Sequence, residues 1–397
     1  MKIVIVGACV RRQDYKLYKS LSVAGNKMLL GFAEGFVENG CSVEVVSVTP
    51  RAMRRFKKNG EPLFQKEDFY TDNLVDFNII KYCNFIPLKQ RSIRINIGKK
   101  LKKIIKNHKK TSEEEIVVCV YNTFSYFVRS VIKYTKKFNV LSCGIIADMP
   151  TKNIKKGPLR KIEDRLQEKY VSKLDVLVPL TKQIAEDFAP NSPYLVVEAG
   201  LDVKNYANLE NKKKNNSVKK VVFSGSLDSL SGIQLALDAF KFIDSDEVVF
   251  NVYGRGKYSV NVEEASKADK RIKYCGVVDN QSMLKLQREA DLLICPRLSD
   301  DYTTKYTFPS KVLEYICAGV PVLCNKLEGI PDEYTNYIEF AANEKPETWA
   351  QKMLEILSDK EGYYYKKAQL AKQTVFEIKT WKTQTAKVKK FLETNLV

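Results

Sequence analysis

A lysine and a glutamate three residues apart, Lys311 and Glu314, could together bind a nucleotide. We expect a helix from Lys311 to about Ala318, capped by Ser310 and ended by Gly319, on which the two side chains share one face. The lysine adds a full charge to the positive end of the helix dipole, which attracts phosphate. The carboxylate, one turn deeper, could accept hydrogen bonds from the two hydroxyls of a ribose. The pair therefore fits a nucleoside diphosphate.

Two apolar runs, residues 291–296 and 320–323, predict parallel strands on either side of this helix. In such a strand, loop, helix and strand unit, ligands collect at the carboxyl ends of the strands. The same alternation of apolar runs and helical patterns extends from residue 2 to residue 197. It predicts an α/β protein with doubly wound parallel sheets.

The segment FPSKVLEYICAGVPVL, residues 308–323, closely resembles the carboxyl-terminal signature of retaining GT-B glycosyltransferases of family four, particularly those that build bacterial surface polysaccharides. The resemblance implies two facing Rossmann-like domains with the active site in the cleft between them. It also implies a nucleotide-sugar donor whose ribose is held by Glu314 and whose diphosphate is held by Ser310 and Lys311, next to Phe308 and Pro309. Sugar transfer to a hydroxyl acceptor, with retention of the anomeric configuration, would follow.

The sequence departs from that family at the positions that bind the phosphates and the sugar. Relatives usually carry Arg and Lys in the first loop of the second domain, where this chain has Gly225-Ser226 and Ser231-Gly232. Backbone N–H groups and Ser226 could still bind a phosphate. Arg255 and Arg297 each follow an expected strand, and they could supply the charge or could be surface ion-pair partners. Many relatives have a second Glu where Tyr306 stands, so the sugar preference is open.

Three further positions are implied by the resemblance. The backbone around Val278 would contact the base. Gly25 and Asn26 belong to a run, from Ser22 to Lys27, that resembles an S-x-x-x-N-K loop facing the cleft. The alternative for this run is a helix cap with a solvated lysine, in front of a helix expected over residues 26–39.

Asp148 follows an expected strand at residues 140–146. Many relatives carry a His in this region as an acceptor-side group, and Ala147 stands at the matching position here. Asp148 is therefore the best available carboxylate to orient an acceptor hydroxyl, with a turn-capping aspartate as the alternative. His108 is the only histidine, which makes a Ser-His-Asp triad improbable and excludes a multi-histidine metal site.

The length of 397 residues allows two domains, and we assign residues 1–200 to an acceptor domain and 201–374 to a donor domain. An exposed linker is expected at residues 210–220. The resemblance implies that residues 375–397 contain a terminal helix, about 375–395, that crosses back onto the first domain.

Positive charge is concentrated in the first half of the chain. The net charge is +19, and residues 1–200 hold 36 Lys and Arg against 20 Asp and Glu. This asymmetry predicts an anionic partner. A helix over residues 93–110 carries an apolar stripe surrounded by lysines, which suits either the surface of an anionic membrane or a sheet-covering helix with a solvated face. No aromatic residues interleave with a basic motif in the manner of a nucleic-acid binder, so we expect no nucleic-acid partner.

No cofactor and no metal are expected. Asp300 and Asp301 are adjacent rather than in the Asp-x-Asp spacing of a metal motif, and the nine cysteines read as buried, reduced thiols. The sequence has no signal-peptide pattern and no apolar run of spanning length, which predicts a cytoplasmic protein. With the basic first domain, this suggests a peripheral enzyme on the inner face of the plasma membrane that acts on a saccharide or lipid-linked acceptor. A non-catalytic scaffold and a nucleotide-sugar 2-epimerase are the alternatives.

Overall fold

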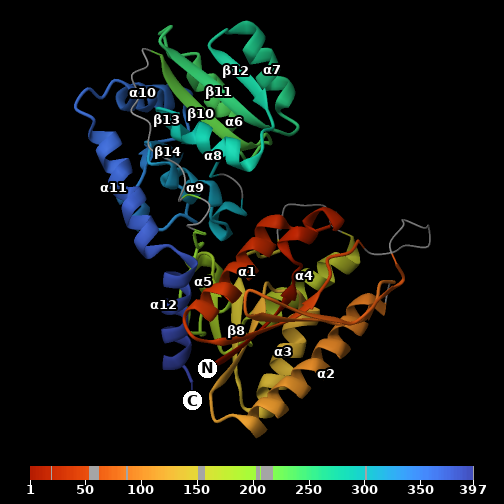
Figure 1. Cartoon of the computed structure of the whole chain (residues 1–397). Helices are drawn as coiled ribbons and strands as arrows, with labels where there is room; N and C mark the ends of the chain where they lie inside the picture. The colour runs from red at the N-terminus through yellow and green to blue at the C-terminus, as the bar shows by residue number, and fades with distance from the viewer. Residues whose placement is uncertain are drawn as a thin grey trace. The chain divides into compact units, whose positions relative to one another are not determined.

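The computed structural model describes residues 1–18, 20–52, 62–85, 88–150, 157–202, 206, 218–299 and 302–396. The chain forms two compact units, which are described separately (Figure 1). The first unit contains Met1–Gly200 and Trp381–Val397, and the second contains Leu201–Thr380. The linker expected at residues 210–220 lies mostly outside the described residues, as do Asp300 and Asp301.

The first unit is built on one sheet of seven strands. Its strands are β1 (Lys2–Ala8), β2 (Ser42–Val48), β4 (Asp68–Asp72), β5 (Val75–Ile79), β7 (Ile116–Tyr121), β8 (Leu141–Ile146) and β9 (Val176–Pro179). Their order is β4-β5-β2-β1-β7-β8-β9, and every pair is parallel except β4 with β5. Apolar runs such as IVVCVY form these strands because helices cover both faces of a parallel sheet. A short antiparallel pair, β3 (Phe64–Gln65) and β6 (Tyr82–Cys83), lies outside this sheet.

Most helices of the first unit bury an apolar face. They are α1 (Val23–Glu38), α2 (Leu88–Thr111), α3 (Ser125–Phe138), α4 (Pro158–Val171), α5 (Lys182–Phe188) and α12 (Trp381–Thr394). Phe32 and Phe36 of α1 are fully buried among the strands. The stripe of α2 (Ile93, Ile97, Leu101, Ile104, Ile105) is likewise buried, and α2 packs on α3, β2 and β6. The apolar face of α2 is therefore used inside the unit, and its lysines form the outer face.

The second unit repeats the same strand order without an antiparallel edge. Its strands are β10 (Lys219–Ser226), β11 (Val248–Arg255), β12 (Ile272–Gly276), β13 (Leu292–Cys295), β14 (Val322–Asn325) and β15 (Glu339–Ala341). They are arranged β12-β11-β10-β13-β14-β15, all parallel. This is the Rossmann order 3-2-1-4-5-6, in which the order reverses between β10 and β13. The α/β class with two Rossmann-like sheets is as the sequence predicts.

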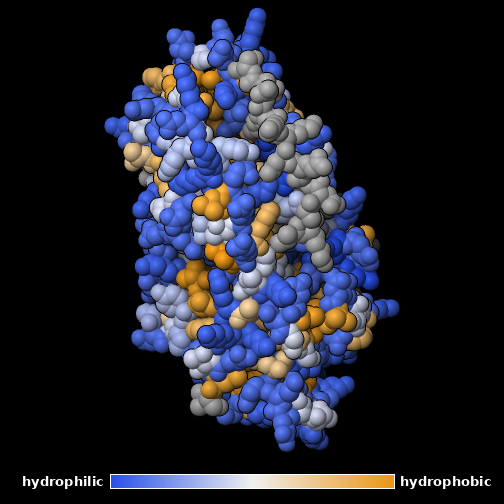
Figure 2. All heavy atoms as spheres, turned by 60° about the vertical axis from the view of Figure 1, so that its left-hand side comes forward, coloured by the Kyte–Doolittle hydropathy of each residue, from blue (hydrophilic) through white to orange (hydrophobic). Residues whose placement is uncertain are grey.

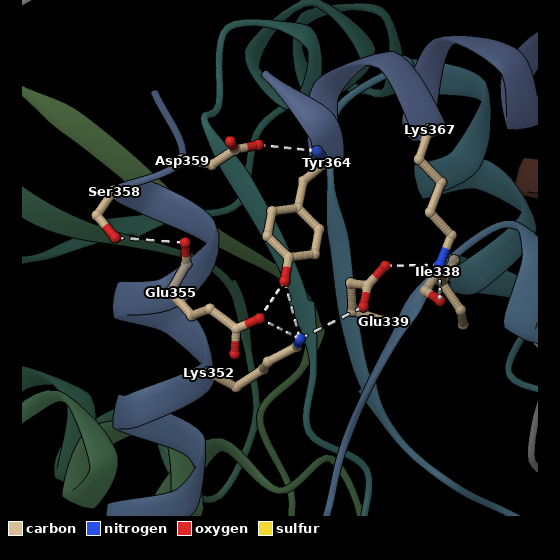
Figure 3. A network of polar contacts seen from close by, with 8 residues as sticks. All are labelled: Ile338, Glu339, Lys352, Glu355, Ser358, Asp359, Tyr364 and Lys367. Carbon is tan, nitrogen blue, oxygen red and sulfur yellow. Dashed lines mark hydrogen bonds and ion pairs between the residues drawn. The ribbon is translucent and has the colours of Figure 1, made fainter. Parts of the chain in front are cut away.

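Six α-helices of the described residues belong to the second unit. They are α6 (Ile233–Phe240), α7 (Ser259–Ala268), α8 (Asn280–Arg288), α9 (Ser310–Ala318), α10 (Pro346–Leu357) and α11 (Tyr363–Ile378). A polar network joins α10 and α11 to β15 (Figure 3). Lys367 of α11 donates to Glu339 of β15 at 2.6 Å, and Lys352 of α10 contacts the other oxygen of Glu339 at 3.5 Å. Tyr364 and Glu355 complete the network, which fixes the last helices of the unit on its edge strand.

Several sequence expectations about element boundaries are wrong. The helix expected over residues 26–39 begins earlier, at Val23, because the Ser22 side chain caps it by accepting from the Gly25 N–H. A strand is expected over residues 194–197, the last apolar run of the alternation. This segment does run beside β9, because the Leu195 and Val197 N–H groups each donate to β9 carbonyls at 3.0 Å. Its single parallel bridge, between Tyr194 and Leu177, is isolated, however, and no full strand forms.

The single terminal helix expected over about 375–395 is two helices, α11 and α12. The helix breaks because Leu201 pairs with the chain there: its N–H donates to the Lys379 carbonyl at 2.7 Å, and it forms a parallel bridge with Thr380. This bridge lies where the chain enters and leaves the second unit. The unit boundary in the structure is therefore Thr380, rather than residue 374 as predicted.

The surface in view in Figure 2 is mostly hydrophilic, and most of the thiols are buried. Hydrophilic residues cover most of the described surface on the face shown in Figure 2, with hydrophobic residues in separate groups. Within the described ranges, every helix is too short or too polar to cross a membrane. All nine cysteines are free. Six are buried, as expected, whereas Cys83 and Cys295 are half-buried and Cys275 is exposed.

Candidate functional site

A pocket of about 310 Å³ opens in the second unit where the strand order reverses. It lies at the carboxyl ends of β10 and β13 and at the amino end of α9. This is the position at which open α/β sheets bind ligands. The predicted residues that line it are Gly225, Ser226, Arg297, Phe308, Pro309, Ser310 and Lys311.

Lys311 and Glu314 lie together, as their spacing predicts. The Lys311 ammonium is 2.7 Å from Glu314 Oε1, and both side chains retain solvent contact. The amide of Gln287, on α8, donates to the same carboxylate oxygen at 2.8 Å. Gln287 is completely buried and also donates to Ser224 Oγ at 3.2 Å. One oxygen of the Glu314 carboxylate is therefore held by both a buried amide and a partly exposed lysine.

The start of α9 is fixed by a residue that the sequence reasoning did not select. The hydroxyl of Tyr315 accepts from the Ser224 N–H at 2.8 Å and donates to the Ser224 carbonyl at 3.1 Å. Burial raises the pKa of this hydroxyl well above its ordinary value, so it stays protonated. Ser310 is the first residue of α9 rather than its cap, because Pro309 occupies the cap position without a side-chain hydrogen bond. Gly319 ends the helix in the left-handed conformation, as expected.

Arg297 points its guanidinium toward the pocket from the loop after β13. Its Nη2 donates to Thr307 Oγ1 at 3.0 Å, while its Nε is buried without a hydrogen-bond partner among the described residues. The backbone of Arg297 is held in turn: Asn325 Nδ2 donates to the Arg297 carbonyl at 3.0 Å, and Trp349 Nε1 donates to Asn325 Oδ1 at 2.8 Å. An unpartnered buried N–H on a positioned cation indicates a site for an anionic ligand.

Two cations, Arg297 and Lys311, and one carboxylate, Asp228, line the pocket. Hydrogen bonding from Cys324 lowers the pKa of the Cys295 thiol, and the charges of Arg297 and Lys311 act in the same direction, although burial opposes them. The Asp228 carboxylate accepts from the Ser231 N–H at 2.9 Å. The loop that carries cations in the family thus carries serines and an aspartate here.

Two predicted positions lie near the pocket without lining it. Arg255, the last residue of β11, is exposed and pairs in register with Ser226. It stands within the strand rather than after it. Gly254 makes this approach possible, since a Cβ there would lie 1.8 Å from the Gly225 carbonyl oxygen. Val278 is in the loop before α8, next to the helix cap Asp279.

Gly25 and Asn26 lie in the first unit, within α1 rather than in a loop. Asn26 is buried, and its side chain accepts from the Val10 N–H and donates to the Val10 carbonyl, both at 2.9 Å. Asn26 therefore ties the segment after β1 to α1, and the predicted role of Asn26 in binding substrate has no support in this geometry. Lys27 is exposed, as the helix-cap alternative expects.

Asp148 stands at the carboxyl end of β8 beside a buried tyrosine. Asn122, in the left-handed conformation, accepts from the Ala147 and Asp148 N–H groups at 2.9 and 3.2 Å. Desolvation raises the pKa of the Asp148 carboxyl above its ordinary value, although the residue keeps contact with solvent and Asn122 opposes the shift. Tyr121 ends β7 and is 5% exposed, and its hydroxyl has no hydrogen-bond partner among the described residues.

The acidic residues do not form a metal centre in the described ranges. No group of three or more His, Cys, Asp or Glu side chains within those ranges is arranged to hold an ion. The sequence does contain an Asp-x-Asp spacing, at Asp244 and Asp246, which the predictions overlooked. It lies between α6 and β11, at the amino edge of the sheet, and faces Arg271 rather than the pocket.

Sequence reasoning missed Gln287, Tyr315 and Tyr121. For Gln287 a signal exists: it falls on the same helical face as Met283 and Leu284, where a polar residue must be buried and hydrogen-bonded. Tyr315 and Tyr121 give no such signal, because tyrosine in an apolar run is ordinary core material.

Residues 218–359 match the family described as Glycosyl transferases group 1. No curated protein sequence matches the chain. Solved structures match over nearly its whole length. Sucrose-phosphate synthase from Thermosynechococcus elongatus is 10% identical with a TM-score of 0.64, covering 99% of this chain and 98% of that one. HepE from Anabaena, solved in complex with UDP, is 11% identical with a TM-score of 0.66, covering 99% and 100%.

The protein has the GT-B fold. The lipopolysaccharide outer core galactosyltransferase WaaB shares it, at 11% identity and a TM-score of 0.64 over 98% of this chain and 99% of that one. At such identities the likeness shows the fold alone. The pocket described above falls inside the segment that matches the Glycosyl transferases group 1 family.

Proposed function

We propose that this protein is a retaining glycosyltransferase that moves a sugar from a nucleoside-diphosphate sugar to a hydroxyl acceptor. The observation that carries the proposal is that Lys311 and Arg297 line one pocket at the strand-order reversal of a GT-B second unit. Glu314 does not line the pocket itself, but it lies 2.7 Å from the Lys311 ammonium. A carboxylate suits ribose hydroxyls and the two cations suit a diphosphate. No metal is part of the proposal.

The chemical barrier in this reaction is departure of the diphosphate as an oxocarbenium-like centre forms. A fixed positive field at the leaving oxygens lowers this barrier. Lys311, Arg297 and the N–H groups at the start of α9 would provide it. Once Glu314 binds the ribose, the Lys311 ammonium can turn to a phosphate oxygen. We assign Ser310, Gly225 and Ser226 to phosphate hydrogen bonds, Arg255 to the rim, and Val278 to the base.

The acceptor side of the proposal rests on Asp148 and Tyr121 of the first unit. A raised pKa makes the Asp148 carboxylate a stronger base toward an acceptor hydroxyl. The unpartnered Tyr121 hydroxyl supplies a second hydrogen-bonding group at the strand-order reversal of that sheet. We propose a saccharide acceptor linked to a lipid, used at the cytoplasmic face of the plasma membrane in surface polysaccharide synthesis. The positive charge of the first unit supports this location.

A second candidate is a non-catalytic scaffold that keeps the fold. Asp228 and Ser231 occupy the loop that carries cations in the family. Tyr306, where many relatives have a glutamate, is buried against Tyr302. Both observations favour weaker donor binding, so the decisive measurement is donor binding itself.

The first test is thermal denaturation with UDP, GDP and their sugars, with and without EDTA. A ligand present at about 100 times its Kd stabilises the native state by about 2.7 kcal/mol. We expect one nucleotide series to raise the melting temperature, whether or not EDTA is present. UDP is tried first because HepE was solved with it. No shift with any nucleotide would favour the scaffold, and a shift abolished by EDTA would contradict metal-independent binding.

Glu314→Ala tests the ribose contact. Hydrogen bonds to a charged group contribute about 1.5–3 kcal/mol each, so losing two should weaken nucleotide binding by about 100-fold or more. Isothermal titration measures this directly. Glu263→Ala is the matched control, because Glu263 is exposed on α7, whereas Glu314 is bonded to the pocket residue Lys311. Unchanged affinity in a folded Glu314→Ala protein would contradict the proposed role of the carboxylate.

A further inference from the structure

A second hollow, of about 540 Å³, lies on the first unit between α2, α3 and α4. In Figure 1, α2 and α3 run side by side at the lower right. The hollow is lined by Arg94, Ile95, Lys99, Arg129, Ser130, Ile132, Lys133, Tyr134 and Tyr170. We call it the basic groove. It is separate from the pocket of the second unit and from Asp148.

The charge of the basic groove has one sign. Four of its lining residues are cations and none is acidic. The two helices that form its long walls contain ten Lys and Arg in α2 and four in α3, with no Asp or Glu in either. Among the described residues, no carboxylate is within ion-pair distance of Arg94, Lys99, Arg129 or Lys133. Uncompensated cations that converge on one hollow attract phosphate groups.

The groove is a fixed structure rather than a collection of mobile side chains. Ser130 Oγ donates to the Arg94 carbonyl at 2.9 Å and joins α3 to α2. The ring of Tyr134 packs directly over Gly98, where a Cβ would lie 2.5 Å from the ring. The Arg129 guanidinium lies 5.4 Å from the centre of the Tyr170 ring. Both tyrosines are thus occupied by packing and are not open for base stacking.

Aliphatic side chains accompany the cations on the outer face of α2. Leu88 is 47% exposed and Ile95 is 43% exposed, and they are seven residues apart on one face. Arg91 and Lys99 stand four residues to either side of Ile95. Cations with interspersed exposed aliphatic groups are typical of surfaces that lie on anionic membranes, whereas nucleic-acid surfaces offer exposed aromatic rings.

We propose that the basic groove docks the protein on a membrane by binding the phosphate groups of anionic phospholipids, with Leu88 and Ile95 entering the headgroup layer. The inference extends the proposed function, since an enzyme acting on a lipid-linked acceptor must reach the membrane. The test of membrane docking needs neither donor nor acceptor, so the docking proposal and the proposed function can fail independently.

The test is flotation of the full-length protein with two kinds of vesicle, phosphatidylcholine alone and phosphatidylcholine mixed with phosphatidylglycerol. The groove variant combines Arg94→Gln, Lys99→Gln, Arg129→Gln and Lys133→Gln. The matched control removes the same charge from exposed second-unit residues, as Lys267→Gln, Lys270→Gln, Lys345→Gln and Lys366→Gln. Circular dichroism establishes that both variants are folded.

We expect the wild-type protein to prefer the phosphatidylglycerol vesicles. Each basic residue near an anionic surface contributes appreciably to binding, so the groove variant should lose about tenfold or more and the control less than about twofold. Equal losses in both variants would show diffuse charge attraction and overturn the groove. Equal binding to both vesicles, or none to either, would overturn docking by anionic headgroups. A single-stranded RNA is added as a competitor. If it releases the wild-type protein from the vesicles and does not bind the groove variant, the groove belongs to nucleic acid instead.

Discussion

Gln287 shows how one buried side chain can set the chemistry of an exposed one. Its amide nitrogen joins Glu314, on the neighbouring helix, to Ser224, on the central strand of the second unit. The amide oxygen of Gln287 is buried without a partner among the described residues. Burying an amide oxygen without a hydrogen bond costs stability, so such a side chain is retained where its amide nitrogen serves a purpose. Orienting the Glu314 carboxylate is such a use.

Gln287→Leu should therefore weaken nucleotide binding while leaving the fold intact. The variant removes an unsatisfied oxygen together with the hydrogen bond to a carboxylate, so stability should change little and affinity should fall about tenfold, from a loss of about 1.5 kcal/mol. Titration calorimetry and urea denaturation measure the two quantities. Gln234→Leu is the control, since Gln234 also donates to a carboxylate, at 3.1 Å, but that carboxylate belongs to Asp238 rather than Glu314. Equal affinities for the two variants would refute the role of Gln287.

At the scale of elements, the sequence predicts the inner strands well, and the edge strands β4, β12 and β15 and the helix ends poorly. Runs such as KIVIV and IVVCVY become central strands because only a sheet covered on both faces buries them completely. Two helices escaped prediction for the opposite reason. Only Val262 is buried in α7, and α11 buries a narrow row of small residues (Ala368, Ala371, Val375), so neither shows a wide apolar stripe.

The contacts of the candidate site that lie close together in sequence could be predicted, and the contacts between distant segments could not. The spacing of Lys311 and Glu314 indicates a shared helix face, which the structure has. The approach of Arg297 to the pocket depends on residues distant in sequence: Asn325 donates to the Arg297 carbonyl, and Trp349 donates to Asn325. No local pattern encodes such contacts. The break between α11 and α12 is also tertiary in origin, since Leu201 bridges to Thr380.

The loop from β10 to α6 depends on a glycine that allows close packing against the loop after β13. Gly232 has a φ of +70°, and a Cβ there would lie 1.7 Å from the Pro296 carbonyl oxygen. Gly232→Ala should force the two loops apart, which moves Arg297 and weakens nucleotide binding. The cost should be about 1–2 kcal/mol for the backbone conformation plus about 1–3 kcal/mol for the clash.

Gly362→Ala separates these two costs. Gly362 has nearly the same φ, +71°, but a Cβ there would meet nothing within 4 Å. Urea denaturation should show the smaller loss for Gly362→Ala, and its nucleotide affinity should be unchanged. If both variants lose the same stability and keep the same affinity, the contact between the two loops does not matter to the site.

At the scale of the whole molecule, the chain begins and ends in the same unit. After it leaves the second unit beside Leu201, it forms α12, which packs on α1. The Trp381 ring packs directly on two glycines. A Cβ atom built at Gly31 would lie 2.1 Å from the ring, and one built at Gly200 would lie 2.3 Å from it. Thr385 occupies the same role at Gly35, one turn along. Small residues on α1 thus determine where the last helix docks.

Removing the Trp381 ring should lower the stability of the first unit without changing that of the second. Trp381→Ala deletes a large, partly buried ring that lies 5.1 Å from Phe32, and we expect a loss of about 2–4 kcal/mol of unfolding free energy, at the low end for a Trp because the ring keeps some solvent contact. Hydrogen exchange should become faster in α1 and α12 and stay unchanged in α9 and β14. Leu370→Ala, at an exposed position of α11, should change neither. Faster exchange in α9 as well would mean that the docking of α12 also stabilises the nucleotide pocket, so the units would not be energetically independent.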